Sequence, residues 1–302
     1  MIRPGQKHKW RALIIGFALL LLIAAGCNGT QDENLPDSDN EEKTCVAVSI
    51  LPQETFVRAV GGDLVEVITM VPPGASTANY SPSPKTLQDL AQARIYFSIA
   101  VPAEKNILPK FEQINKELKL VDLAARVDAV YPPREIAAGQ RDPHCWMSPR
   151  RVIQMVKIIA DELSGLSPQN ADYFRENAAD YCAQLEQLDQ DIQAALSNPP
   201  RRNFIVYHPS MGYFADDYEL EMIALEKEGK AATAKDFQEL IDFARAENIK
   251  VVFYQAEMDG KQAQSLAAEI GGRAELIAPL APDYIDNLRK TAVVFSSVLK
   301  EE

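Results

Sequence analysis

The sequence predicts an α/β protein of two Rossmann-like lobes that are joined by one long rigid helix, with a binding cleft between the lobes. Short apolar segments alternate with helical segments over residues 44–167 and again over 198–302. Such a βαβα rhythm indicates mainly parallel sheets that helices cover on both faces. Residues 168–197 break the rhythm, since no Gly or Pro falls between 169 and 196. We therefore assign an N-terminal lobe, a connecting helix and a C-terminal lobe.

The N-terminal lobe is expected to contain four strands with helices between them. Predicted strands cover Cys45–Ile50, Val65–Val71 and Ile95–Ile99, and a fourth begins at Lys119–Val121. Predicted helices cover Gln53–Val60, Lys85–Ala93 and Glu104–Leu118. Gly61-Gly62 and Pro72-Pro73-Gly74 mark the ends of the first helix and the second strand.

The connecting segment has the pattern of one continuous helix. Its apolar residues form a single helical stripe of Phe174, Tyr181, Leu185, Leu188, Ile192 and Leu196. At 1.5 Å per residue such a helix is roughly 40 Å long, more than one small lobe requires. It is therefore expected to span both lobes.

The C-terminal lobe resumes the alternation. Predicted strands cover Asn203–Tyr207, Lys250–Tyr254 and Ala274–Ile277. Predicted helices cover Lys235–Glu247, Lys261–Ile270 and Tyr284–Leu299. Neither a Gly-rich phosphate loop nor a Ser or Cys nucleophile motif occurs in the chain.

The first 26 residues have the features of a secretory signal. Four basic and no acidic residues precede a short apolar run, and Ala24-Ala25-Gly26 lead directly to Cys27. This arrangement resembles a bacterial lipobox, so we expect Cys27 to be lipid-modified and residues 27–43 to form a flexible acidic tether. The alternative is an ordinary cleaved signal with an incidental Cys. Either reading places the protein outside the cytoplasm, and the lipobox adds a membrane anchor.

Composition excludes one large class of partner. The formal net charge is −12 at pH 7, and no basic cluster provides an electrostatic footprint for nucleic acid. Cys45, Cys145 and Cys182 remain after Cys27, with separations that fit no zinc-finger pattern. We expect a monomer that does not bind nucleic acid.

Two histidines carry the chemistry that the sequence offers. The chain has three, and His8 lies in the signal segment, which leaves His144 and His208 in separate lobes. His208 closes a predicted strand, where ligand sites of open α/β sheets lie. Imidazole is a favoured ligand of zinc and related divalent ions, so the two could hold one ion in the cleft. A capping or packing role for each histidine is the simpler alternative.

Several motifs in fixed order resemble the solute-binding lipoproteins of zinc/manganese ABC importers, the ZnuA/TroA-like family. They lie at residues 61–67, 71–75, 80–85, 142–150 and 207–214, and the Asp142-Pro143-His144-Cys145-Trp146 segment is the most characteristic. The resemblance implies a two-lobed protein with a metal cleft. Such a protein captures zinc or manganese and delivers the metal to an ABC permease, and His144 and His208 occupy ligand positions.

Two expected ligands of that family are absent. Ala78 stands where the family has its first His, and Ala278 where it has an Asp before Pro-Leu. Glu228 is the first choice as a replacement, because a carboxylate suits zinc or manganese and Gly229 permits a tight turn. The other candidate donors or cleft-lining residues are Glu226, Gln53, Asn79, Tyr80, Gln255 and Glu257.

Two alternatives to metal capture remain open. A degenerate family member with weak or no metal binding would serve another ligand or a surface adhesion role. A metal-assisted hydrolase would need an activated water and a general base at an open metal site, yet no motif identifies a base. A binding protein rather than an enzyme is therefore expected.

Overall fold

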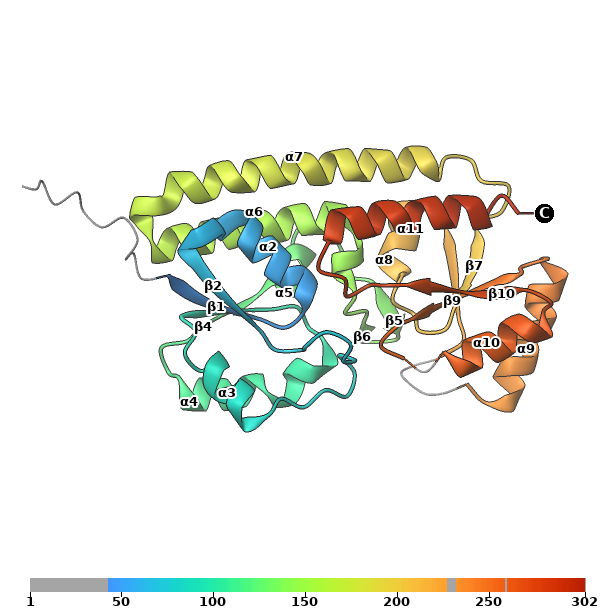
Figure 1. Ribbon diagram of the computed structural model, residues 1–302, viewed down its shortest axis with the longest axis horizontal. Helices are drawn as coiled ribbons and strands as arrows, with labels where there is room; N and C mark the ends of the chain where they lie inside the picture. The colour runs from blue at the N-terminus through green and yellow to red at the C-terminus, as the bar shows by residue number, and fades with distance from the viewer. Residues whose placement is uncertain (1–42, 227–231, 259, 302) are drawn as a thin grey trace, which may run out of the picture. The chain divides into compact units, whose positions relative to one another are not determined.

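The N-terminal sheet is parallel and fully covered. The structure, a computed structural model, describes residues 43–226, 232–258 and 260–301 (Figure 1). The sheet has the strand order β2-β1-β3-β4 and comprises β1 (Thr44–Val48), β2 (Val65–Thr69), β3 (Ile95–Ser98) and β4 (Lys119–Asp122). Val46 of β1 is paired with Val67 of β2 and with Ile95 of β3. All four β3 side chains are buried, as expected of a strand between two helical layers.

The C-terminal sheet is also parallel. Its order is β10-β9-β7-β8, with β7 (Asn203–Val206), β8 (Glu221–Ala224), β9 (Val251–Gln255) and β10 (Arg273–Ile277). In both sheets the first strand of the lobe lies between the second and the third, and the fourth follows the third. The two lobes thus repeat one topology, and each has a point between its first and third strands where the strand order reverses.

Helices cover both sheets. In the N-terminal lobe they are α2 (Leu51–Gly61), α3 (Pro84–Leu90), α4 (Leu108–Ile114) and α5 (Leu123–Asp128). In the C-terminal lobe they are α8 (Gly212–Asp217), α9 (Ala234–Ala246), α10 (Lys261–Glu269) and α11 (Tyr284–Val298). A short antiparallel pair, β5 (Glu135–Ala137) and β6 (Gln140–Arg141), precedes the His144 segment.

One long helix, α7 (Ala171–Ala195), connects the lobes, and a second long helix, α6 (Pro149–Leu166), packs beside it on the N-terminal lobe. Helix α7 contacts α2 of the first lobe and α11 of the second (Figure 1). The predicted stripe faces inward, since Phe174, Leu185 and Leu188 are buried. Pro168 opens a short 3-10 turn, so the α-helix begins three residues after the predicted start.

Helix α6 was not predicted, although its signals are present. Ser148 caps the helix by accepting a hydrogen bond from the Arg151 amide, and Pro149 occupies the first turn, where its missing N–H costs nothing. Its core face recurs at helical spacing and is fully buried: Val152, Val156, Ile159 and Leu163.

One predicted helix is wrong in its extent. Residues 104–118 form a 3-10 turn at Pro102–Asn106 and then the shorter α4. Pro109 lacks an amide proton and its ring excludes a helical carbonyl four residues earlier, so the two turns cannot merge. Asn115 then leaves the helix and donates its side-chain amide to the carbonyls of Ala91 and Ala93.

The α/β fold class with two lobes and a long connecting helix is confirmed. Within the described ranges no helix is both long enough and apolar enough to cross a membrane. Cys27, the predicted signal and the predicted tether up to residue 42 lie outside these ranges.

Candidate metal site

His208 is held at the carboxyl end of the C-terminal sheet. It follows β7 by two residues, and its Nδ1 lies 2.7 Å from Oε2 of Glu226, which follows the neighbouring strand β8. The Glu226 amide also donates to the Tyr207 carbonyl at 2.9 Å, which fixes the two loops to each other. Because a carboxylate only accepts hydrogen bonds, Nδ1 carries the proton and Nε2 keeps its lone pair.

His144 is held in the same way by its own segment. Its Nδ1 lies 2.8 Å from Oδ1 of Asp142, and the same oxygen accepts the His144 amide at 2.9 Å. Asp142 is fully buried and pairs with Arg134 through its other oxygen at 3.4 Å. Burial raises the pKa of Asp142, but the hydrogen bond and charge of His144 outweigh burial and the net shift is downward. The carboxylate therefore stays ionised and orients the ring.

Burial keeps the His144 imidazole neutral. It lowers the pKa of His144, and the hydrogen bond and charge of Asp142 offset this only in part. His144 is 7% exposed, and its ring packs against Trp146 with ring centres 5.2 Å apart. The Trp146 indole donates to the Pro279 carbonyl at 2.9 Å, and Tyr284 donates to the Trp146 carbonyl at 2.7 Å. These bonds fasten the His144 segment to the C-terminal lobe.

The two rings direct their Nε2 atoms at each other. The separation of these atoms is 3.3 Å. Since each Nδ1 proton is directed at a carboxylate, two lone pairs face one another, an arrangement that a shared cation stabilises. Two zinc–nitrogen bonds of 2.0–2.1 Å at a tetrahedral angle place the nitrogens about 3.3–3.4 Å apart. The geometry thus matches one edge of a tetrahedral site.

The rings line a small cavity between the lobes. Its volume is about 20 Å³, enough for one water-sized occupant. The lining residues are Ser76, Thr77, Ala78, His144, Trp146, His208, Gln255, Glu257, Met258, Pro279 and Leu280. Among the described residues, no group of three or more His, Cys, Asp and Glu side chains is drawn together tightly enough to hold a metal ion. In the structure, the two histidines are thus the candidate donors that already face each other, and any further donor has to come from elsewhere in the cavity.

The remaining sequence candidates take different places. Glu226 orients His208, and Gln255 lines the cavity while its amide donates to the Ser210 hydroxyl at 2.6 Å. The Gln53 side chain caps α2, accepting from the Ser49 and Ile50 amides and donating to the Phe97 carbonyl. These bonds hold the Gln53 amide within the N-terminal lobe, and neither Gln53 nor Tyr80 lines the cavity. Glu228, the first choice as a replacement donor, lies outside the described residues.

Sequence reasoning assigned no role to Asp142, although it quoted the motif that contains it. The sequence contains this signal, because an Asp two residues before a His can bond both the amide and the ring of that His.

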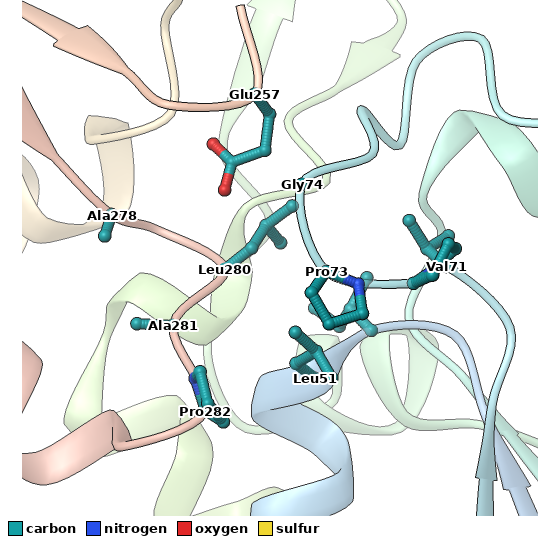
Figure 2. A pocket seen from close by; sticks show the side chains of 11 residues that line it. Leu51, Val71, Pro73, Gly74, Glu257, Ala278, Leu280, Ala281 and Pro282 are labelled. Atoms are coloured by element: carbon teal, nitrogen blue, oxygen red, sulfur yellow. The ribbon is translucent and has the colours of Figure 1, made fainter.

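Ala78 and Ala278, the two positions where the expected metal ligands are missing, lie in different cavities. Ala78 lines the cavity of the histidines, whereas Ala278 lines a neighbouring cavity of about 170 Å³ (Figure 2).

The repeated α/β topology, the long helix α7 along both lobes and the paired imidazoles between the lobes are features of a two-lobed solute-binding protein. The chain belongs to the family described as "Zinc-uptake complex component A periplasmic", which matches residues 46–298. This family is one of transport components that act outside the cytoplasm. The predicted resemblance is confirmed.

Individual relatives agree. The chain is 25% identical to the high-affinity zinc uptake system protein ZnuA of Bacillus subtilis, over 90% of this chain and 89% of that protein. A crystal structure of a zinc-bound ZnuA deletion mutant is 36% identical and has a TM-score of 0.82, covering 86% of this chain and all of that one. A manganese-bound periplasmic protein from Candidatus Liberibacter asiaticus shares the fold at 20% identity, with a TM-score of 0.76 over 85% of this chain and all of that one.

Proposed function

We propose that this protein captures a divalent metal ion, zinc or manganese, outside the cytoplasm and delivers it to an ABC permease. His144 and His208 hold the ion through their Nε2 atoms. The observation that carries the proposal is the 3.3 Å separation of the two Nε2 atoms, with both Nδ1 atoms directed at buried carboxylates. The family and the zinc-named relatives support it.

The donor set favours zinc over manganese. Imidazole suits zinc, whereas manganese prefers carboxylate, carbonyl and water oxygens. Two imidazoles leave coordination positions for further donors, so the affinity is set by what completes the shell. The family is one of transport components, which favours metal capture over a metal-assisted hydrolase.

Zinc titration tests the proposal. Calorimetry on untagged protein near pH 7.5 should show one zinc per chain, with affinity lost in His144→Ala and His208→Ala. Glu176→Gln, an exposed change on α7, is a control that should bind as wild type does. Equal zinc affinity in wild type and the double histidine variant would contradict metal capture at this site. The degenerate-site alternative would then replace it.

The anchor and the oligomeric state belong to the same proposal. Cys27 is the lipid-modified first residue of a monomeric mature protein, on the basis of the small residues and apolar run before it. Cys27→Ser should abolish acyl labelling and release the protein from the membrane fraction. Unchanged labelling of that variant would contradict the anchor and leave metal capture untouched.

A further inference from the structure

We propose that Glu257 supplies a carboxylate donor to the captured metal, in place of the acid that is missing at Ala278. This inference rests on the proposed function, because it names the third protein ligand of the same site. The resulting set of two His and one Glu is a known donor set for zinc that leaves the fourth position free for water.

The fold places Glu257 beside His208. The strand order of the C-terminal sheet reverses between β7 and β9, and ligands of open α/β sheets bind outside the carboxyl ends of strands at such a point. His208 follows β7 by two residues, and Glu257 follows β9 by two residues. The 2.6 Å hydrogen bond from Gln255 to Ser210 joins the two strand ends. Equivalent positions on adjacent strands thus carry an imidazole and a carboxylate.

The two cavities meet at Glu257. Its side chain lines the cavity of about 20 Å³ with His144 and His208, and also the neighbouring cavity of about 170 Å³. Figure 2 shows the carboxylate extending from its loop into the larger cavity, on the side of Ala278 and Leu280. The other residues that line this cavity are apolar and include Val71 and Pro282. Within that set Glu257 is the single ionisable side chain.

One oxygen of the Glu257 carboxylate is unpartnered. The Glu257 backbone amide bonds to the carboxylate, but among the described residues the buried Oε2 atom has no hydrogen-bond partner. Burying a charged oxygen without a partner is costly, so such groups are normally paired or bind metals. A divalent ion between the histidines would give this oxygen a positive partner.

Ala278 explains why the donor comes from this loop. Ala278 directly follows β10 and lines the larger cavity together with Glu257. A methyl group at 278 offers no donor there, so the ionisable side chain of this cavity comes from the adjacent strand end. In the structure, no three His, Cys, Asp or Glu side chains of the described residues lie close enough together to bind one ion. The Glu257 side chain must therefore rotate about its own bonds to reach an ion between the histidines. Glutamate has the rotatable bonds for such a movement.

The test combines a loss with a rescue. Zinc affinity of Glu257→Gln, which keeps the shape and removes the charge, should fall at least 10- to 100-fold, as losses at metal shells commonly do. Adding Ala278→Asp to Glu257→Gln should recover most of the affinity by restoring an acid from β10. Glu176→Gln should leave the affinity unchanged. Melting temperatures without metal check that each variant is folded.

Cobalt gives a second readout that a structural role would not change. The visible spectrum of the cobalt-loaded protein should differ between wild type and Glu257→Gln at saturating metal, because a ligand is exchanged. If Glu257→Gln binds zinc as wild type does, with an unchanged cobalt spectrum, while His208→Ala does not bind, the Glu257 ligand is wrong and metal capture stands. If wild type binds no better than His208→Ala, the proposed function fails, and the Glu257 ligand fails with it.

Discussion

The two lobes repeat one strand order but use their reversal points differently. At the N-terminal point, between β1 and β3, the buried Glu104 accepts hydrogen bonds from Ser49 and from the amides of Ile99 and Ala100, both at 2.8 Å. Tyr96 completes the network through Ser49 at 2.9 Å. At the C-terminal point, His208 and Glu257 face a cavity and Glu257 keeps an unpartnered oxygen.

The difference shows what separates a structural site from a binding site on the same topology. The acid of the first lobe is satisfied by its own backbone, so it holds the Ala100 turn, whose φ of 63° is unusual for a residue with a side chain. The acid of the second lobe keeps one buried oxygen for which the described residues provide no partner. The topology offers both lobes a site, and hydrogen-bond satisfaction indicates which one is available to a ligand.

The largest expected effect is the loss of zinc affinity in His208→Ala, which changes the C-terminal site and leaves the N-terminal network intact. His208→Ala removes one of two imidazoles and leaves Glu226 without its partner, so zinc affinity should fall by about 100-fold or more. Calorimetry measures the loss. The unfolding free energy without metal should change far less than the affinity; a variant that is unfolded at 25 °C would show that His208 serves packing instead.

A smaller effect should come from the orienting carboxylate. Glu226→Gln keeps the shape of the side chain but weakens its hydrogen bond with His208 Nδ1. Zinc affinity should fall about 10-fold, the lower end of the range of about 10- to 100-fold for residues that hydrogen-bond to metal ligands. The matched change in the N-terminal lobe, Glu104→Gln, should leave zinc affinity unchanged. A comparable loss in both variants would mean that the two reversal points are coupled.

The N-terminal network should be visible in the pH dependence of stability. Burial raises the pKa of Glu104 to about 7 from an ordinary 4.5, although hydrogen bonds from Ser49 and the backbone oppose this. The folded state therefore holds a proton that the unfolded state releases between about pH 4.5 and 7, and stability falls as pH rises through that window. At about 1.4 kcal/mol per pKa unit, the fall attributable to Glu104 is up to about 3 kcal/mol.

Denaturant titrations of metal-free protein at several pH values measure this contribution. Glu104→Gln should reduce the pH dependence between pH 4.5 and 7, with Glu176→Gln as the surface control. The Gln variant should also be less stable at pH 5, because its amide cannot accept both backbone protons. An unchanged pH profile would show that Glu104 titrates normally.

The smallest expected effect concerns movement of the lobes. Helices α6 and α7 pack together along their length, and α7 contacts α2 and α11, so zinc binding should change the lobe arrangement little. Solution scattering with and without zinc should give nearly identical curves. A marked compaction on zinc addition would show that the helix pair bends.

Sequence patterns predicted most of the strands and helices. A buried strand such as β3 is a short apolar run, and a packed helix such as α7 has apolar residues at helical spacing. Helix α6 is marked equally clearly in the sequence, by the Ser148 cap, Pro149 and a buried apolar stripe. The break at Pro109 follows from proline chemistry that the pattern of apolar residues does not show.

The site was predictable only in part. Few histidines and fixed motifs pointed to His144 and His208, but the roles of Asp142 and Glu226 depend on where separate loops meet. Gln53 had the right position in sequence, yet its amide caps a helix, which only the hydrogen bonds reveal. Glu257 became the strongest additional donor because an unpartnered buried oxygen is a property of packing.

X-ray absorption at the zinc edge tests the central claim most directly, because it reports the atoms bound to the metal. For zinc-loaded wild type, two imidazole nitrogens at about 2.0–2.1 Å are expected, with oxygen donors completing the shell. The imidazole signal should be halved or lost in His208→Ala. A zinc spectrum without imidazole scattering in wild type would contradict metal capture by His144 and His208.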